Sequence, residues 1–540
     1  MFTRIKKVKN SRGELREYLL LVENHWDKGK VRQKTIANLG RLDIIKKTQM
    51  ADVLMEKLAE YTRQSQLMDM AKTQADYSKE YGPVLVLRRL WESLGFDQFF
   101  AECLRRYKYR ADLKESLFAM VVNRLLDPKS EHAIEKWLQD VYEQRWEGIR
   151  LQHLYRGLDF LERHWTDFER DFFLKVTDLF SQQLDLIMFD TTTIKYWGEG
   201  EEAEILQHGY SKDKRGDLKQ LIIGVLMSKD GYPVAVELIP GNTPDVKSFL
   251  TTVTKLKVRY NIGRIIWVCD RGMVSKKNVD ELKECNQEYI FGVRMRQFDK
   301  ETRRELLNPK GMWEVKDNLY AKEVYKEGVG RYIVCYNPEE AEHKHYKRVA
   351  FKRHLNKKLA TSSPKDWMIK NGYKKYVDFE GTLELNEKKL HEESQYDGYW
   401  VLLTNTTMET REVALRYKDL WQIEHGFRDL KSELETSPVF HYKERRIKAH
   451  VHVCFLALIL KIALEKKIKT VDAKCSYGGI LDALKRIKAV KLTSGKDEII
   501  FRTEFPDKAY LAFKALNLAP PPRILVYNKS KNIVSRPEGV

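Results

Sequence analysis

The chain has 540 residues, of which 43% are hydrophobic, and this is enough for two or more domains with apolar cores. A net charge of +19 points to a polyanionic partner such as nucleic acid. The six cysteines are scattered without a CxxC pair, which argues against a zinc ribbon and a disulfide framework. The longest apolar run, from Val451 to Leu460, is too short to span a membrane. We therefore expect a soluble, cytoplasmic protein with no membrane partner.

The N-terminal part of the chain predicts two regions. Residues 1–75 fit a β-hairpin plus helix module, with strands at 17–22 and 31–39 and a helical period from Asp43 to about Ala71. Residues 76–180 are expected to be mostly helical, because apolar residues recur there at three- and four-residue spacing. This basic region fits a DNA-binding role, and a packing role fits it equally well.

From residue 181 to 299, short apolar runs alternate with helical segments. Strands are predicted at 184–190, 219–228, 232–240, 263–270 and 288–293, and helices at 245–260 and 275–285. This order is typical of an α/β fold with a ribonuclease H-like core, in which helices cover a mixed sheet. Asp190 and Asp270 are expected at the C-terminal ends of buried strands. Two adjacent buried carboxylates need cations, which indicates a divalent metal, although either aspartate alone also fits a helix cap or a turn.

The remaining chain predicts three further regions. Residues 300–398 fit a β-rich insertion, residues 399–470 the second part of the ribonuclease H-like core, and residues 471–540 a C-terminal region whose end after Pro522 is loosely held. His450 and His452 lie on one predicted helix about 200° apart, so they are expected to be structural and not to share a metal.

The segment from Arg411 to Leu434 predicts one helix that carries two stripes. Its apolar stripe consists of Leu420, Ile423, Phe427, Leu430 and Leu434. Its polar edge consists of Tyr417, Glu424, Arg428 and Lys431. A carboxylate followed by two cations indicates a bound anion. The alternative is a solvated flank on which Glu424 pairs with Arg428 one turn away.

Several short motifs resemble those of bacterial insertion-sequence DDE transposases. They are FDTTT at 189–193, GYSKDKRGDLKQ at 209–220, GN with the following Asp245, CDRGM at 269–273, and the polar edge of the 417–431 helix. Within that group the chain is similar to the insertion sequence four superfamily, whose signature is Tyr, Arg, Glu and Lys at fixed spacing. The resemblance extends over about 184–460, and the family's β-rich insertion is matched in position.

The resemblance implies roles for these residues. Asp190, Asp270 and Glu424 would be the catalytic triad and the metal ligands, and Tyr417 and Lys431 would hold DNA. The signature arginine is replaced by Leu420, so we expect Arg428 to take over its work. Candidate phosphate contacts in the loop after the first strand, which fits a solvated loop equally well, are Lys212, Lys214, Arg215 and Lys219.

The expected reaction is cleavage of the ends of the element followed by joining to target DNA. Two Mg²⁺ ions, with Mn²⁺ as a substitute, would lie about 3.5–4 Å apart at the carboxylates. The partners would be double-stranded DNA, both as terminal inverted repeats and as target, and a second copy of the chain in a synaptic homodimer. A hairpin intermediate and a nucleoid-associated location in a bacterial cytoplasm are further implications. The alternatives are a non-catalytic DNA-binding protein derived from a transposase and a structure-specific nuclease of the same fold.

Overall fold

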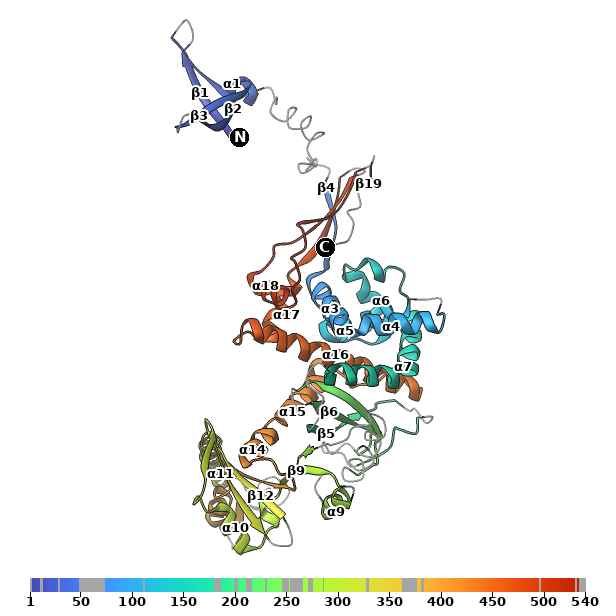
Figure 1. The fold of residues 1–540 in the computed structure, drawn as a ribbon, viewed down its shortest axis with the longest axis vertical. Helices are drawn as coiled ribbons and strands as arrows, with labels where there is room; N and C mark the ends of the chain where they lie inside the picture. The colour runs from blue at the N-terminus through green and yellow to red at the C-terminus, as the bar shows by residue number, and fades with distance from the viewer. Residues whose placement is uncertain are drawn as a thin grey trace. The chain divides into compact units, whose positions relative to one another are not determined.

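The computed structural model describes residues 2–9, 13–27, 30–47, 73–109, 112–178, 186–198, 203–209, 216–228, 231–244, 252, 266–270, 275–284, 286–326, 330–361, 376–379, 383–494, 497–529 and 532–533. The chain divides into two compact units, whose elements are labelled in Figure 1. The first unit comprises Met1–Ser78, Val490–Arg502 and Pro522–Val540, and the second comprises Lys79–Ala489 and Thr503–Pro521.

An antiparallel three-stranded sheet begins the first unit. It consists of β1 (Phe2–Lys9), β2 (Leu15–Asp27) and β3 (Lys30–Arg41), followed by helix α1 (Leu42–Lys47). The expected hairpin is confirmed as β2 and β3, and Leu20, Val22 and Ile45 are buried. Strand β1 is exposed along its whole length, so no alternation of buried and polar positions marks it in the sequence. The predicted helix beyond residue 47 falls on residues 48–71, which lie outside the described residues.

Strands from distant parts of the chain form a second sheet in the first unit. Its order is β19-β18-β17-β16-β4, with bounds Asn532–Ile533, Ile524–Lys529, Asp497–Arg502, Lys488–Ser494 and Thr73–Glu80. Lys491 of β16 lies 2.8 Å from Glu498 of β17 and 3.7 Å from Asp76 of β4. The expectation of a loosely held end is therefore wrong for residues 524–529, because they pair with β17.

Helices form the second unit from Gly82 to Asp178, as the apolar spacing predicts. They are α3 (Gly82–Ser93), α4 (Phe96–Arg106), α5 (Leu113–Leu126), α6 (Glu131–Trp137) and α7 (Leu151–Asp178), with 3-10 turns at Leu138–Asp140 and Gln144–Trp146. Aromatic rings fill their core. A buried ion pair lies beside them, in which Arg88 donates to both oxygens of Glu115 at 2.7 Å. The indole N–H of Trp146 donates to the same carboxylate at 3.2 Å.

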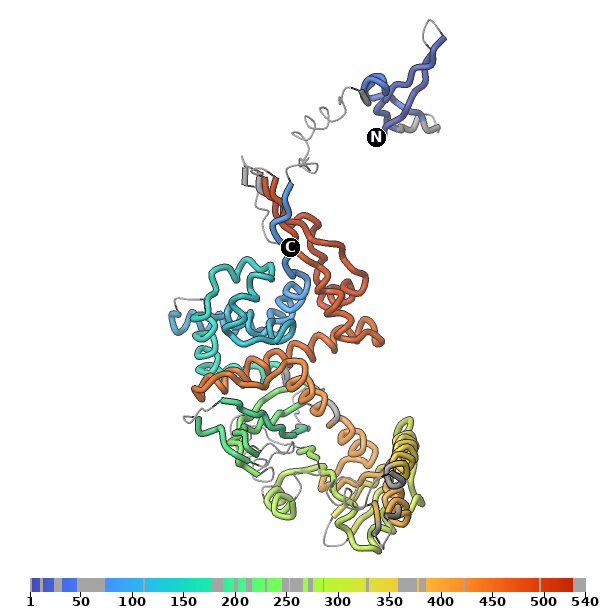
Figure 2. The backbone as a smooth tube through the Cα atoms, turned by 180° about the vertical axis from the view of Figure 1, so that it is seen from behind, coloured from blue at the N-terminus to red at the C-terminus, as the bar shows by residue number. Residues whose placement is uncertain are grey.

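Helix α16 (Glu444–Val471) lies at the centre of the second unit. It packs against α5 and α7 and against strand β7 (Pro233–Pro240), and the views in Figures 1 and 2 both show it between the helical region and the sheet. Helices α17 (Tyr477–Lys485) and α18 (Asp507–Ala515) pack together, α18 also against α16. Among the described helices, α16 alone is long and apolar enough to cross a membrane, but 89% of its most apolar window is buried inside the protein. This is the pattern of a core helix.

A nine-stranded mixed sheet occupies the rest of the second unit, in the order β10-β11-β12-β15-β9-β8-β5-β6-β7. The bounds not yet given are β5 (Leu186–Lys195), β6 (Gln220–Ser228), β8 (Ile266–Cys269), β9 (Glu288–Val293), β10 (Trp313–Lys316), β11 (Leu319–Lys326), β12 (Gly330–Tyr336) and β15 (Tyr399–Thr404). Strands β5, β6 and β7 are antiparallel neighbours, whereas β8 runs parallel to both β5 and β9. Every residue of β6 is buried, as in a strand covered on both faces.

The segment 300–398 contributes directly to this sheet, since β15 pairs with both β9 and β12 and thereby joins β10–β12 to the other strands. The smaller elements of this part are α9 (Lys276–Glu284), the 3-10 turn Met295–Gln297, α10 (Lys300–Leu307), α11 (Pro338–Thr361), β13 (Val377–Phe379), β14 (Leu383–Leu385) and α13 (Glu387–Ser394). The predicted strand at 399–405 and helix at 275–285 are confirmed. The predicted helix at 245–260 lies outside the described residues except for Thr252.

The expected single helix from 411 to 434 is divided. It consists of α14 (Thr410–Lys418), α15 (Trp421–Arg428) and a π-helical turn at Asp429–Glu433. At the division, the N–H of Leu420 donates to the carbonyl of Tyr417 three residues back, which is a tighter turn than the α-helix makes. The apolar stripe is nevertheless confirmed, because all five of its side chains are buried.

Candidate catalytic site

Asp190 and Asp270 lie at the same level on neighbouring parallel strands. The ladder between β5 and β8 pairs Met188 with Val268, and two residues further along each strand the same register places Asp190 beside Asp270. Alternate residues of a strand share a face, so both aspartates belong to the face of Met188 and Val268. That face packs into the hydrophobic core that contains Ile423 of α15. The expected pair of carboxylates is thus brought together below the helices α14 and α15.

The position of Asp190 within its strand corrects the sequence prediction. Asp270 directly follows the end of β8, as expected, but β5 continues from Asp190 to Lys195. Thr191, Thr192 and Thr193 are β-branched and favour the continued strand. Asp190 is therefore a residue of the strand interior, paired with Val225 of β6.

The two aspartates have different surroundings. Asp190 is half-buried, and its Oδ1 accepts the N–H of Thr191 at 2.7 Å, whereas Asp270 is exposed. The buried thiol of Cys269 reports both charges: burial raises its pKa well above the usual range, and the carboxylates of Asp190 and Asp270 raise the pKa further. The site is therefore a strongly anionic end of the sheet, with one carboxylate open to a ligand.

Tyr417 contacts this pair directly. Its hydroxyl donates to Oδ1 of Asp270 at 3.2 Å. The phenol passes over Gly292 of β9, where a Cβ would lie only 2.1 Å from the hydroxyl oxygen and 2.9 Å from Cζ. Gly292 thus provides the space that lets Tyr417 reach Asp270. The sequence analysis missed this role, although an isolated glycine inside a strand is a known sign of close approach.

Glu424 lies on α15, which packs on β5 and β6. Its side chain is exposed, on the polar edge of the helix beside the buried stripe that contains Ile423 and Phe427. Among the described residues, the carboxylates of Asp190, Asp270 and Glu424 do not all approach within 4.8 Å of one another.

The predicted DNA contacts on this helix are solvent-accessible. Arg428 and Lys431 are exposed, and among the ion pairs between described residues there is none between Glu424 and Arg428. The alternative of a simple pair one turn apart is therefore not what the structure shows. Leu420 is buried, whereas Arg416 pairs with Glu412 at 3.6 Å and Asp419 at 3.9 Å.

The glycines Gly209 and Gly241 of two motifs lie in tight backbone contacts. A Cβ on Gly209 would lie 2.0 Å from the carbonyl oxygen of Gly241, and one on Gly241 would lie 1.8 Å from that of Gln220. Gln220 also donates from Nε2 to the Gly241 carbonyl at 2.9 Å. Lys219 is half-buried, and its carbonyl accepts the N–H of Tyr196. Lys212, Lys214 and Arg215 lie outside the described residues.

A buried lysine, which the sequence analysis did not single out, holds the π-helical turn. The ammonium group of Lys461 on α16 lies 2.7 Å from Asp429 and 2.5 Å from Glu433. These carboxylates stand at the first and last positions of the turn, between which Lys431 is exposed. Burial opposes the charge of Lys461, but the two carboxylates raise its pKa above the usual value. The turn is therefore fixed from inside the protein.

The family of the chain follows from comparison with known proteins. Residues 181–460, more than half of the chain, match the family described as "Transposase DDE domain". The chain therefore belongs to the DDE-domain transposases. Residues 4–71 match the description "IS1634 family transposase, N-terminal domain". Taken together, the two matches show that the protein is a DNA transposase of a bacterial insertion sequence.

Two solved structures are similar to parts of the chain. One is described as "Cryo-EM structure of piggyBac transposase synaptic complex with hairpin DNA", with 10% identity and a TM-score of 0.35 over 78% of this chain and 82% of that chain. The other is described as "Mos1 transposase paired-end complex with left transposon end", with 12% identity and a TM-score of 0.14 over 36% of this chain and 66% of that chain. No curated protein matches the chain.

Proposed function

We propose that this transposase cuts the ends of its insertion sequence and joins them to target DNA at Asp190, Asp270 and Glu424. The observation that carries the proposal is the equal level of Asp190 and Asp270 on parallel neighbours β5 and β8, on the face where α15 packs. The core would be ribonuclease H-like. Three antiparallel strands followed by two parallel ones, with helices on both faces, support that assignment.

The same proposal divides the chain by role. Residues 181–299 and 399–470 would form the two parts of the catalytic core, separated by the insertion at 300–398. Residues 1–75 and 76–180 would form the N-terminal module and a DNA-binding helical region, and residues 471–540 the C-terminal region. The match of residues 4–71 to a transposase N-terminal domain supports the first boundary.

The residues at the site fit a hard divalent cation. Asp190, Asp270 and Glu424 offer only carboxylate oxygens, and these are the ligands that Mg²⁺ and Mn²⁺ prefer. Asp270 is exposed, so a ligand can reach it without unfolding the sheet. When bound, such ions supply charge stabilisation and an activated oxygen nucleophile for displacement at phosphorus.

The side chains around the carboxylates would orient the DNA. Tyr417 holds Asp270 by its hydroxyl, which fixes the direction of that carboxylate. Arg428 and Lys431 are exposed next to Glu424 and would bind phosphates on either side of the cleaved bond, with Lys212, Arg215 and Lys219 contributing from the loop before β6. The substrates would be the terminal inverted repeats and target DNA. Two copies of the chain would hold the two ends in the bacterial cytoplasm, next to the nucleoid.

The test separates binding from chemistry. Asp190→Asn, Asp270→Asn and Glu424→Gln should each abolish Mg²⁺-dependent cleavage of end DNA and leave its affinity nearly unchanged, because affinity rests on cations that face phosphates. Asp280→Asn, at an exposed position of α9, is the matched control and should cut normally. A triad variant that still cuts at the parent rate would contradict the assignment.

The products of the same assay distinguish the alternatives. A transposase yields ends joined to a target plasmid, a structure-specific nuclease yields only cut ends, and a DNA-binding protein without activity yields neither. Joined products from the parent chain would therefore exclude both alternatives.

A further inference from the structure

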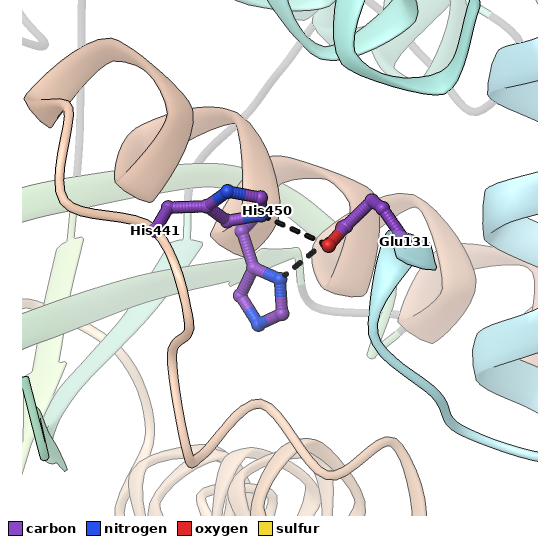
Figure 3. A group of neighbouring side chains, drawn as sticks. All are labelled: Glu131, His441 and His450. Atoms are coloured by element: carbon purple, nitrogen blue, oxygen red, sulfur yellow. Dashed lines mark ion pairs between the residues drawn. The ribbon is translucent and has the colours of Figure 1, made fainter. Parts of the chain in front are cut away.

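A second group of metal-ligating side chains lies outside the proposed catalytic site. Glu131 begins α6, His441 lies between the π-helical turn and α16, and His450 lies on α16. All three are buried, and their ligand atoms lie within 4.8 Å of one another. His441 Nε2 is 3.1 Å from Oε2 of Glu131, and His450 Nδ1 is 3.9 Å from Oε1 (Figure 3). The two rings thus converge on one carboxylate.

The hydrogen bonds of the two rings leave this arrangement incomplete. His450 Nε2 lies 3.1 Å from the carbonyl oxygen of Thr436, so Nε2 carries the proton and donates it. When the ring is neutral, Nδ1 carries a lone pair on the side of Glu131. His441 Nε2 is buried and makes no hydrogen bond, although it stands close to the same carboxylate. Buried nitrogens without a well-formed hydrogen bond are costly, and a cation shared between these groups would satisfy them.

A neighbouring arginine does not meet that need. Nη2 of Arg124 lies 4.0 Å from Oε1 of Glu131, and no hydrogen bond joins Arg124 to either ring among the described residues. The guanidinium balances the charge of Glu131 but supplies no hydrogen bond to His441 Nε2. The positive charge of Arg124 also repels a metal ion, so it lowers the affinity of the site for the ion, but the three ligand side chains are still in place.

We propose that Glu131, His441 and His450 form a site for a divalent transition metal of the zinc class, separate from the catalytic carboxylates. Two imidazole nitrogens and one carboxylate form a ligand set typical of Zn²⁺. The contact of His450 with the Thr436 carbonyl is the outer-shell hydrogen bond that metal-binding histidines usually make. The nitrogen ligands also distinguish this site from the all-oxygen set at Asp190, Asp270 and Glu424.

The bound ion would connect two distant parts of the second unit. Glu131 belongs to the helical region, whereas His441 follows the turn that carries Lys431. The flanking residues Phe440 and Tyr442 are exposed by 66% and 61%. Fixing His441 therefore fixes the backbone that presents these two aromatic rings to solvent.

The test measures metal binding directly. The full chain, carrying Asp190→Asn and Asp270→Asn to weaken the catalytic site, is stripped with a chelator and dialysed against Zn²⁺ in excess Mg²⁺. We expect one equivalent of Zn²⁺ to be retained, and Co²⁺ in its place to give the visible absorption of a nitrogen-ligated, low-coordinate ion. A chain that retains no Zn²⁺ would overturn the proposal without any effect on the proposed catalytic residues.

Variants then locate the ion. His441→Gln and His450→Gln should each lose the bound Zn²⁺, whereas His452→Gln should retain it. His452 is the matched control because it is also buried on α16 but stacks on Trp165 with ring centroids 3.8 Å apart and contacts Glu162 at 3.0 Å. Equal Zn²⁺ retention by the His441 variant and the parent would place the ion elsewhere and overturn the proposal. Zn²⁺ retention by the parent chain tests the proposal even if a variant fails to fold.

Discussion

Replacement of Gly292 by alanine should disable the proposed catalytic site without touching any of its charged residues. The new Cβ would lie 2.1 Å from the hydroxyl oxygen of Tyr417, and an ordinary contact begins near 3.4 Å, so the phenol must move by about 1.3 Å. A hydrogen bond of 3.2 Å to Asp270 does not survive such a shift. The loss costs about 1 kcal/mol of stability. A misplacement of about 1 Å at a reacting group can lower the rate roughly 100-fold.

The assay is cleavage of labelled end DNA at fixed Mg²⁺, accompanied by thermal unfolding and a gel shift. Gly292→Ala should cut roughly 10- to 100-fold more slowly, with nearly unchanged affinity for DNA. The matched control is Tyr417→Phe, which removes the atom that the new methyl group meets first. The double variant should be little worse than Tyr417→Phe alone, because both changes remove the same contact. Normal cleavage by Gly292→Ala, or fully additive losses in the double variant, would refute the reasoning.

Three further predictions test the rest of the site and the fold. Ca²⁺ should support binding of end DNA without cleavage, since it occupies carboxylates with looser geometry than Mg²⁺; full cleavage in Ca²⁺ alone, measured on the same labelled DNA, would argue against the site. Arg428→Ala should slow cleavage or joining by orders of magnitude and leave the free energy of unfolding unchanged. Leu420→Ala should instead mainly lower the free energy of unfolding, by about 2 kcal/mol. If Arg428→Ala joins ends normally, another residue must do the work of the signature arginine, and Arg416 is the next candidate. Glu115→Gln should lower the free energy of unfolding by about 3 kcal/mol in urea, because it leaves Arg88 buried with only Glu143 as a charged partner at 3.1 Å. The control Glu102→Gln, at an exposed position, should leave the free energy of unfolding unchanged.

The parts of the fold that follow local spacing could be predicted from the sequence. The stripe from Leu420 to Leu434 is buried as its three- and four-residue spacing requires, and the strands of the central sheet lie within a few residues of their predicted bounds. Asp270 stands where a strand was expected to end. These features depend on residues close together in the chain.

The parts that depend on distant contacts could not be predicted. The spacing of the 411–434 stripe is the same for one helix and for the divided segment, so it does not reveal the break at Leu420. The π-helical turn depends on Lys461, about thirty residues further along the chain, which holds Asp429 and Glu433. The role of Gly292 depends on Tyr417 of another element, and the joining of β10–β12 to the main sheet depends on β15. A single sequence can mark such a position, as the glycine inside β9 does, but it does not identify the distant partner.

The pairing of β4 with β16 cannot form until β16 has been synthesised, which delays the folding of this sheet during translation. Strand β4 ends at Glu80 and β16 begins at Lys488, so 407 residues must be translated between them. At about 5–20 residues per second, β4 waits roughly 20–80 s for its partner. Until then its edge is open to other strands, and a chain released early leaves it unpaired permanently. Premature termination anywhere before residue 488 should therefore yield aggregating fragments, and only chains synthesised beyond Ile533 contain every strand of this sheet.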